Sequence, residues 1–178
     1  MPDAPPYTTA RVEVVRVPGE TELDAVAVEE PLEIRIGGLP VAVTMRTPGN
    51  DEELALGFCL SEGLSPRAAR LPADLAANTV EVDAGGFDPE RLRRSFYTSS
   101  SCGVCGKGAL DAVAVDAKRV TSELRLPSAL VAALPARLGE AQAAFAATGG
   151  LHATGLFDAD GRLLCLREDV GRHNALDK

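Results

Sequence analysis

Residues 148–178, TGGLHATGLFDADGRLLCLREDVGRHNALDK, decide the fold class of this chain. Gly149 and Gly150 can take positive φ and end a helix. Two β-rich segments, 152–158 and 162–167, follow on either side of an Asp-Gly turn. The polar run 167–174 then opens a further helix, and such strand-to-helix junctions are where open α/β sheets place ligands. The stretch predicts an α/β (α+β) fold with a site at this junction.

The chain upstream of this stretch carries further strand and helix signals. Residues 11–17 and 24–46 are rich in β-branched residues and predict three or four antiparallel strands, with Gly37-Gly38 as a hairpin turn. Asn50 or Asp51 is suited to cap a helix over residues 52–60, in which Cys59 is expected to be a core residue. Residues 65–78 are expected to be a connection and 79–83 a short strand. The Ala/Leu-rich residues 127–147 predict a helix interrupted at Pro135, where the chain either kinks or starts a second helix.

Composition excludes several classes of protein. The chain has 178 residues, 46% of them hydrophobic, and only seven aromatic residues, so its core must be built from Ala, Val and Leu. A net charge of −8 and few aromatic rings argue against a nucleic-acid partner. Residues 1–10 lack the basic and apolar regions of a signal peptide, and no apolar run reaches the length of a membrane span. We expect a cytoplasmic protein without a membrane partner.

The candidate reactive group is the loop SSSCGVCGKG at residues 99–108. Cys102 and Cys105 form a CxxC pair, and Lys107 and the glycine amides favour a thiolate. Four interpretations are open: a thioredoxin-like redox pair, a zinc site, inert structural thiols, and sulfur transfer through a persulfide. The flanking serines and glycines do not fit the first. A zinc site would need two more ligands from Cys59, Cys165, His152 and His173, which form no second CxxC or HxxxH pair.

His152 and His173 have two interpretations, as hydrogen-bonded structural residues or as residues that line a pocket. The polar run 167–174, REDVGRHN, favours a pocket, because so many charged and amide groups at one junction are more typical of a binding site than of a solvated face. Arg167, Arg172 and Asn174 belong to the same run. The sequence therefore predicts a pocket for an anionic ligand around these side chains.

Four motifs together resemble one family. CGVCGK (102–107), TGGLHATGL (148–156), REDVGRHNALDK (167–178) and RTPGNDEELALGF (46–58) occur in the order found in the FdhD family of formate dehydrogenase accessory sulfurtransferases. The resemblance runs from about residue 25 onward. It implies a protein that takes sulfur from a cysteine desulfurase and passes it to the molybdenum cofactor, bis-molybdopterin guanine dinucleotide, needed by formate dehydrogenase.

The resemblance also implies roles for individual residues. Cys102 would carry the persulfide, Cys105 would assist or resolve it, and Lys107 would tune the thiolate. GDP would be an analogue of the nucleotide part of the cofactor. The partners implied are the desulfurase, the formate dehydrogenase catalytic subunit and a second copy in a homodimer. The residues expected to face the cofactor are Gly149, Gly150, His152, Arg167, Arg172, His173 and Asn174.

The family resemblance also implies a domain division. Residues 1–10 would be disordered, 11–47 a small antiparallel β subdomain, and 48–178 a cytidine deaminase-like domain with a three-layer mixed sheet between helices. No H-x-E or C-x-E zinc motif of the deaminases occurs in the chain, so no zinc is expected. Family members continue beyond REDVGRHN, so we expect a chain shortened at its C-terminus. A cofactor-binding chaperone without enzymatic activity and a zinc-stabilised interaction domain are the alternative functions.

Overall fold

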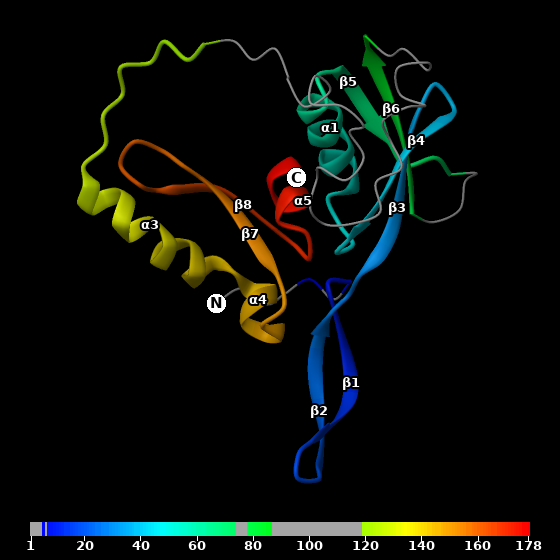
Figure 1. The fold of residues 1–178 in the computed structure, drawn as a ribbon, viewed down its shortest axis with the longest axis vertical. Coiled ribbons are helices and arrows are strands. Elements are labelled where there is room, and N and C mark those ends of the chain that lie inside the picture. The colour runs from blue at the N-terminus through cyan, green and yellow to red at the C-terminus, as the bar shows by residue number, and fades with distance from the viewer. Residues whose placement is uncertain (1–4, 6, 74–77, 87–118) are drawn as a thin grey trace, which may run out of the picture.

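The computed structural model describes residues 5, 7–73, 78–86 and 119–178 (Figure 1). Its strands are β1 (Thr9–Arg16), β2 (Glu20–Ala27), β3 (Glu30–Ile36), β4 (Leu39–Arg46), β5 (Ser65–Arg70), β6 (Thr79–Gly85), β7 (His152–Phe157) and β8 (Leu163–Asp169). Its helices are α1 (Asp51–Ser61), α3 (Ser128–Ala141), α4 (Ala143–Thr148) and α5 (Arg172–Asp177). Cys102, Cys105 and Lys107 lie outside the described residues.

The core is a four-stranded mixed sheet in the order β4-β3-β6-β5, covered on one face by α1. Strand β3 pairs antiparallel with β4 and parallel with β6. Its alternating Leu32, Ile34 and Ile36 are buried, as a half-buried strand requires. Leu54 and Cys59 of α1 pack against this face. The prediction that Cys59 is a core residue is confirmed, and its burial raises the pKa of its thiol to about 11.

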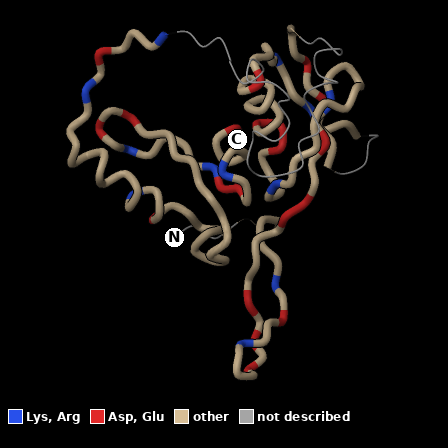
Figure 2. Tube along the Cα trace, in the orientation of Figure 1, with Lys and Arg blue, Asp and Glu red and all other residues tan. Residues whose placement is uncertain are grey.

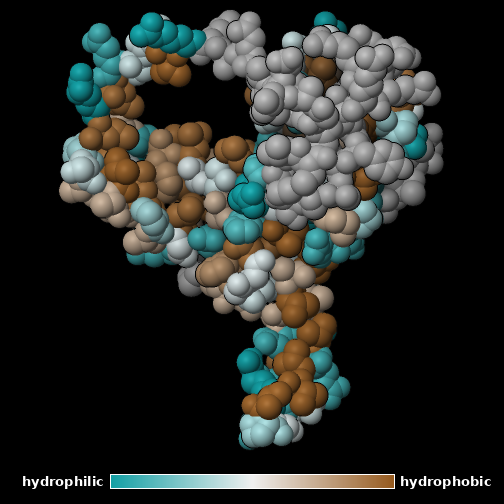
Figure 3. Space-filling model, viewed as in Figure 1, coloured by the Kyte–Doolittle hydropathy of each residue, from teal (hydrophilic) through white to brown (hydrophobic). Residues whose placement is uncertain are grey.

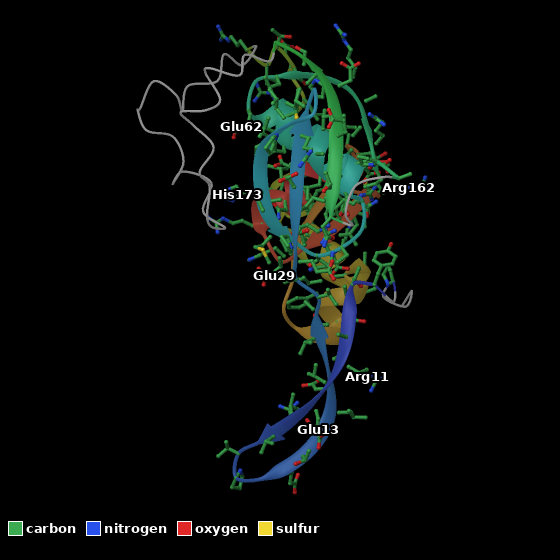
Figure 4. All side chains as sticks on the ribbon, turned by 90° about the vertical axis from the view of Figure 1, so that its right-hand side faces the viewer. Arg11, Glu13, Glu29, Glu62, Arg162 and His173 are labelled. Carbon is green, nitrogen blue, oxygen red and sulfur yellow. The ribbon has the colours of Figure 1, made fainter. Side chains whose placement is uncertain are left out.

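The three or four antiparallel strands expected in residues 11–17 and 24–46 are confirmed as four strands in two pairs, β1–β2 and β3–β4. Gly37 and Gly38 turn the second pair with φ of 60° and 78°, the positive values that a two-residue hairpin of this type requires. The first pair extends away from the rest of the chain in both views (Figures 1 and 4). We call residues 9–27 the arm.

Two predictions about the middle of the chain are wrong. Residues 65–70, expected to be a connection, form the edge strand β5, with a register shift between Pro66 and Ala68. The second helix considered at Pro135 does not start there, because α3 continues through Pro135. The helix ends instead before Gln142, where Glu168 accepts hydrogen bonds from the amides of Ala144 (3.0 Å) and Phe145 (2.8 Å) and so starts α4.

The predicted hairpin near the C-terminus is confirmed as β7–β8, and Asp158 holds its turn by accepting the amides of Asp160 and Arg162. Helix α3 lies close against this hairpin. A Cβ at Gly155 of β7 would lie 2.6 Å from Leu138 Cδ1 of α3, so a residue without a side chain is needed at this position. Gly149 closes α4 with a φ of 68°, as expected.

The α+β class with a mixed sheet is confirmed. The division at residue 47 stays a prediction, although the pairing of β3 with β6 joins strands from both sides of that boundary. The disorder expected at residues 1–10 also stays a prediction. None of the helices in the described ranges is long and apolar enough to cross a membrane.

Candidate functional site

The junction between β8 and α5 is organised by a buried carboxylate, Asp169. Its side chain has no exposed surface and lies 2.7 Å from Lys178 Nζ, in a lysine side chain that is 2% exposed. The amides of Thr47 (3.1 Å) and Gly171 (2.8 Å) and the Nδ2 of Asn174 (3.1 Å) also donate to it. We call Thr47, Asp169, Asn174 and Lys178 the Asp169 cluster. A charge this deep is stable only because it is paired and hydrogen-bonded.

The Asp169 cluster fastens the end of β4 to the C-terminal segment. Lys178 Nζ donates to the Thr47 carbonyl (2.7 Å), and the Val170 amide donates to Thr47 Oγ1 (3.1 Å). Asn174 Nδ2 also donates to the Met45 carbonyl (2.7 Å). These bonds fix the direction in which α5 leaves β8, and with it the side chains that α5 presents.

A second cluster surrounds the buried Arg46, the residue before Thr47. Arg46, 2% exposed, makes a two-point contact with Asp51 (2.9 and 2.8 Å) and donates to Asn78 Oδ1 (2.7 Å) and, at 3.4 Å, to Glu30. We call Glu30, Arg46, Asp51 and Asn78 the Arg46 cluster. Asn50 is the N-cap residue of α1, as predicted, but its side chain makes no capping bond. The Arg46 cluster therefore anchors the start of α1.

Arg167 is held by Glu53 of α1. Its Nε and Nη2 donate to the two carboxylate oxygens at 2.5 and 2.9 Å, and its Nη1 donates to the Leu166 carbonyl and to Cys165 Sγ (3.1 Å). This hydrogen bonding lowers the pKa of Glu53 and raises that of Arg167. Arg167 thus joins β8 to α1, and its predicted role toward a ligand stays a prediction.

The other predicted site residues of this run differ in exposure: Asn174 is bonded inward, and Arg172 and His173 are exposed. The amide of Asn174 is fully used, since its Oδ1 also accepts from Thr44 Oγ1 (3.2 Å). Arg172 and His173 are exposed, and Arg172 has no hydrogen-bond or ion-pair partner among the described residues. His173 points outward from the body of the protein (Figure 4). Burial raises the pKa of Asp177, and the nearby His173 opposes that rise.

Gly149, Gly150 and His152 lie where α4 leads into β7. His152 is exposed and pairs with Asp169 across the β7–β8 ladder, so it lies on the neighbouring strand beside the Asp169 cluster. A Cβ added at Gly150 would lie 3.9 Å from Ala27 Cβ, which is an ordinary van der Waals distance. The structure therefore brings His152, Arg172 and His173 to one junction, where acidic and basic residues lie next to each other around α5 (Figure 2).

Sequence reasoning missed the residues that hold the junction together, Thr47, Asp169 and Lys178. One signal was present: alternation along β8 places Arg167 and Asp169 on one face and Glu168 on the other. The inward face of the strand therefore carries two charges that need partners. Within the described ranges, no three His, Cys, Asp or Glu side chains are grouped so that they could hold a metal ion.

Comparison with known proteins identifies close relatives. A family model described as the FdhD/NarQ family matches residues 27–178. "Sulfur carrier protein FdhD" of Streptomyces avermitilis is 45% identical over 190 residues, covering 96% of this chain and 67% of the relative. The protein of the same name from Mycolicibacterium paratuberculosis is 47% identical over 171 residues, covering 87% of this chain and 63% of the relative.

A solved structure shares the fold. The crystal structure of a protein described as a formate dehydrogenase accessory protein, from Desulfotalea psychrophila, superposes with a TM-score of 0.65 at 22% identity. It covers 95% of this chain and 65% of the other. This chain thus spans about two thirds of the length of the relatives it matches.

Proposed function

The chain belongs to the FdhD/NarQ family, and from this premise we propose that it is a sulfur carrier that serves the maturation of formate dehydrogenase. The observation that carries the proposal is 45% identity, over 96% of the chain, to a relative named a sulfur carrier protein. The CxxC pair at residues 102–105 supplies the thiols that such a role requires.

The proposed chemistry begins at Cys102. Its thiolate attacks the outer sulfur of a persulfide on the donor, whose S–S bond breaks, and the donor cysteine leaves as a thiolate. Cys102 then holds the sulfur as a persulfide, with no net oxidation or reduction. When Cys105 attacks the inner sulfur, a Cys102–Cys105 disulfide forms and the outer sulfur leaves as sulfide. Lys107 favours the thiolate forms electrostatically.

The proposed acceptor is the molybdenum cofactor in its bis-molybdopterin guanine dinucleotide form, as substrate. Phosphate groups on such a ligand call for cations that are not already paired. Arg172 meets this condition, and His173 lies beside it on α5. We propose that Arg172, His173 and His152 contact the ligand, that Gly149 and Gly150 allow close approach, and that Arg167 and Asn174 hold the junction in shape.

The proposed setting follows from the same role. A cysteine desulfurase would donate the sulfur, and the catalytic subunit of formate dehydrogenase would receive the completed cofactor. We propose that the protein works in the cytoplasm as a homodimer.

The carrier role is tested by loading the protein with a cysteine desulfurase and cysteine, followed by mass spectrometry of the intact chain. We expect an added mass of about 32 Da, one sulfur, that is absent from Cys102→Ala. Cys59→Ala and Cys165→Ser are matched controls and should keep the added mass, because Cys59 is a buried thiol of raised pKa. Retention of the sulfur by Cys102→Ala would contradict the assignment.

Ligand binding is tested separately by calorimetry with GDP. We expect Arg172→Ala to weaken GDP binding, while Arg162→Ala, an exposed arginine on the β7–β8 turn, should leave it unchanged. If GDP binding and formate dehydrogenase maturation both survive replacement of Cys102 and Cys105, the protein is a binding chaperone and the carrier proposal is wrong.

A further inference from the structure

The outer face of the four-stranded sheet carries a hollow that the proposed function does not use. Apolar atoms cover much of the arm (Figure 3), whereas the β5–β6 part of this face carries charged and small side chains. The hollow has a volume of about 520 Å³, within the roughly 300–1,000 Å³ of small-molecule sites. Gly37, Ala68, Arg70, Glu81 and Asp83 are among its lining residues. None of the described residues that line it belongs to α1, which covers the inner face.

Strand alternation places three charged side chains on this outer face. Val82 of β6 is buried in the core, so Glu81 and Asp83 on either side of it point the other way. Residues directly opposite each other share a face, and the register pairs Arg70 with Glu81 and Ala68 with Asp83. The four side chains therefore form a square with charges at three corners. The methyl group of Ala68 at the fourth corner leaves the space that a longer side chain would fill.

The ion pair expected for Arg70 is absent from this square. Opposite charges that face each other across two strands commonly attract each other. Here the Glu81 carboxylate instead accepts a hydrogen bond from the Gly38 amide (2.8 Å) in the turn after β3. Arg70 is exposed and has no hydrogen-bond or ion-pair partner among the described residues. Its guanidinium group is therefore free to bind an anion from outside the chain.

The acidic side of the hollow suits a cation. Glu81 uses Oε1 for the Gly38 amide. Asp83 has a side chain that is 65% exposed, and its Oδ1 lies 4.0 Å from Arg67 Nη1, the long end of the range for an ion pair. Such a loose, exposed contact contributes little to stability and does not block a ligand. Arg70 and Asp83 lie on a diagonal of the two strands, which separates Cβ atoms by about 7–8 Å. The hollow thus offers a positive and a negative group at a fixed spacing.

We propose that this hollow binds a small zwitterion of the length of a dipeptide. The terminal carboxylate of the ligand binds Arg70, and its ammonium group binds between Glu81 and Asp83. An extended dipeptide spans about 7 Å, which matches the diagonal spacing of the two charges, and one of its side chains lies over Ala68. A single amino acid spans about half of this length and reaches only one of the two groups well. The inference goes beyond the proposed function, because neither sulfur nor the cysteine pair takes part.

The test is an NMR titration of the isotope-labelled full chain at neutral pH with L-alanyl-L-alanine. We expect the amide signals of β5 and β6 to shift, with a dissociation constant of about 1 mM, because both ion pairs stay exposed to water. Two analogues lack one charge each, N-acetyl-alanyl-alanine and alanyl-alanine amide. Both analogues, and alanine itself, should bind about tenfold more weakly or worse.

Variants identify the side chains that bind the dipeptide. Arg70→Gln and Asp83→Asn should each weaken binding about tenfold, and Ala68→Leu should abolish it by filling the hollow. Arg125→Gln and Asp160→Asn remove exposed charges outside β5 and β6, so these matched controls should bind as the wild type does. Circular dichroism should show every variant folded, because all five substituted side chains are exposed.

Three results would overturn the proposal. The first is an absence of shifts in β5 and β6 at about 20 mM dipeptide, twenty times the expected dissociation constant. The second is equal binding of the dipeptide and its two blocked analogues, which the wild-type chain alone can show. The third is equal binding by Arg70→Gln and Arg125→Gln.

Discussion

Removing Lys178 from the Asp169 cluster should destabilise the fold far more than removing an exposed cation. In Lys178→Met, the Asp169 carboxylate stays buried and keeps three N–H donors, from Thr47, Gly171 and Asn174. Breaking one side of a buried ion pair costs about 3–5 kcal/mol. Because these donors still solvate the carboxylate, we expect the lower end, about 3 kcal/mol.

Removing the other partner of the ion pair, Asp169, should lower the free energy of unfolding further. Asp169→Ala leaves the three donors without Asp169 and leaves a buried ammonium group whose remaining acceptor, among the residues the structure describes, is the Thr47 carbonyl. We expect about 5 kcal/mol for this variant. The double variant Asp169→Leu/Lys178→Met removes both charges and should lose less than the sum of the two, since neither charge is left uncompensated.

The measurement is urea-induced unfolding followed by circular dichroism, which gives the free energy of unfolding of each variant. Arg16→Met is the control, because it removes a cation that is 63% exposed and paired on the arm, and it should cost far less than either buried substitution. The reasoning is refuted if Lys178→Met unfolds within about 1 kcal/mol of the wild type, or if Asp169→Ala costs no more than Arg16→Met.

Two further predictions concern close packing and pH. Gly57→Ala should destabilise the fold by about 2–3 kcal/mol in urea unfolding, because its Cβ would lie 1.9 Å from the Asp177 carbonyl oxygen. Gly139→Ala should stabilise the fold by about 0.5–1 kcal/mol, because the space around Gly139 in α3 is open. Equal effects of the two substitutions would contradict the packing argument. Hydrogen bonds from Arg167 lower the pKa of Glu53, so their stabilisation is present above the usual carboxyl pKa of about 4.3 and is lost as the pH falls through the lowered value. Glu53→Gln should therefore flatten the acid side of the melting temperature against pH, and a curve parallel to the wild type would disprove it.

Local turn chemistry is the part of the fold that the sequence predicts well. Gly37-Gly38, the Asp158 turn and Gly149 each need a backbone conformation or a short side-chain bond that few other residues supply, and all three lie where expected. These features depend on neighbours within four residues. Predictions of this kind need no knowledge of the rest of the chain.

Strand β5 could not be predicted in the same way. SPRAAR has low strand propensity and contains a proline, and it forms because β6 presents a free edge to which it can pair. Pro66 is tolerated because it lies at the sheet edge, beside a register shift. Likewise, α3 continues through Pro135, and the break comes where Glu168, far along the chain, caps the next helix.

The sequence predicts which residues form the candidate site, but it does not predict which of their side chains point inward. The sequence predicts that Arg167, Arg172, His173 and Asn174 all face the ligand. The structure divides them: Arg167 and Asn174 are bonded inward, while Arg172 and His173 are exposed. The partners of this run, Glu53 for Arg167, Met45 for Asn174 and Thr47 for Asp169, are more than 110 residues away. No spacing rule within a single sequence joins positions that far apart.

The Asp169 cluster also has a consequence for the order in which the chain folds. Its bonds to Thr47 span 122, 123 and 131 residues. Closing loops of that length is slow, because chain entropy is lost before the contacts form. During synthesis, β4 and α1 emerge long before Asp169 and Lys178, so the Thr47 backbone must stay hydrated until α5 is made. We therefore expect this junction to be the last part of the described fold to close, and nascent chains stalled before residue 169 to be more easily cut by protease near Thr47 than the completed protein.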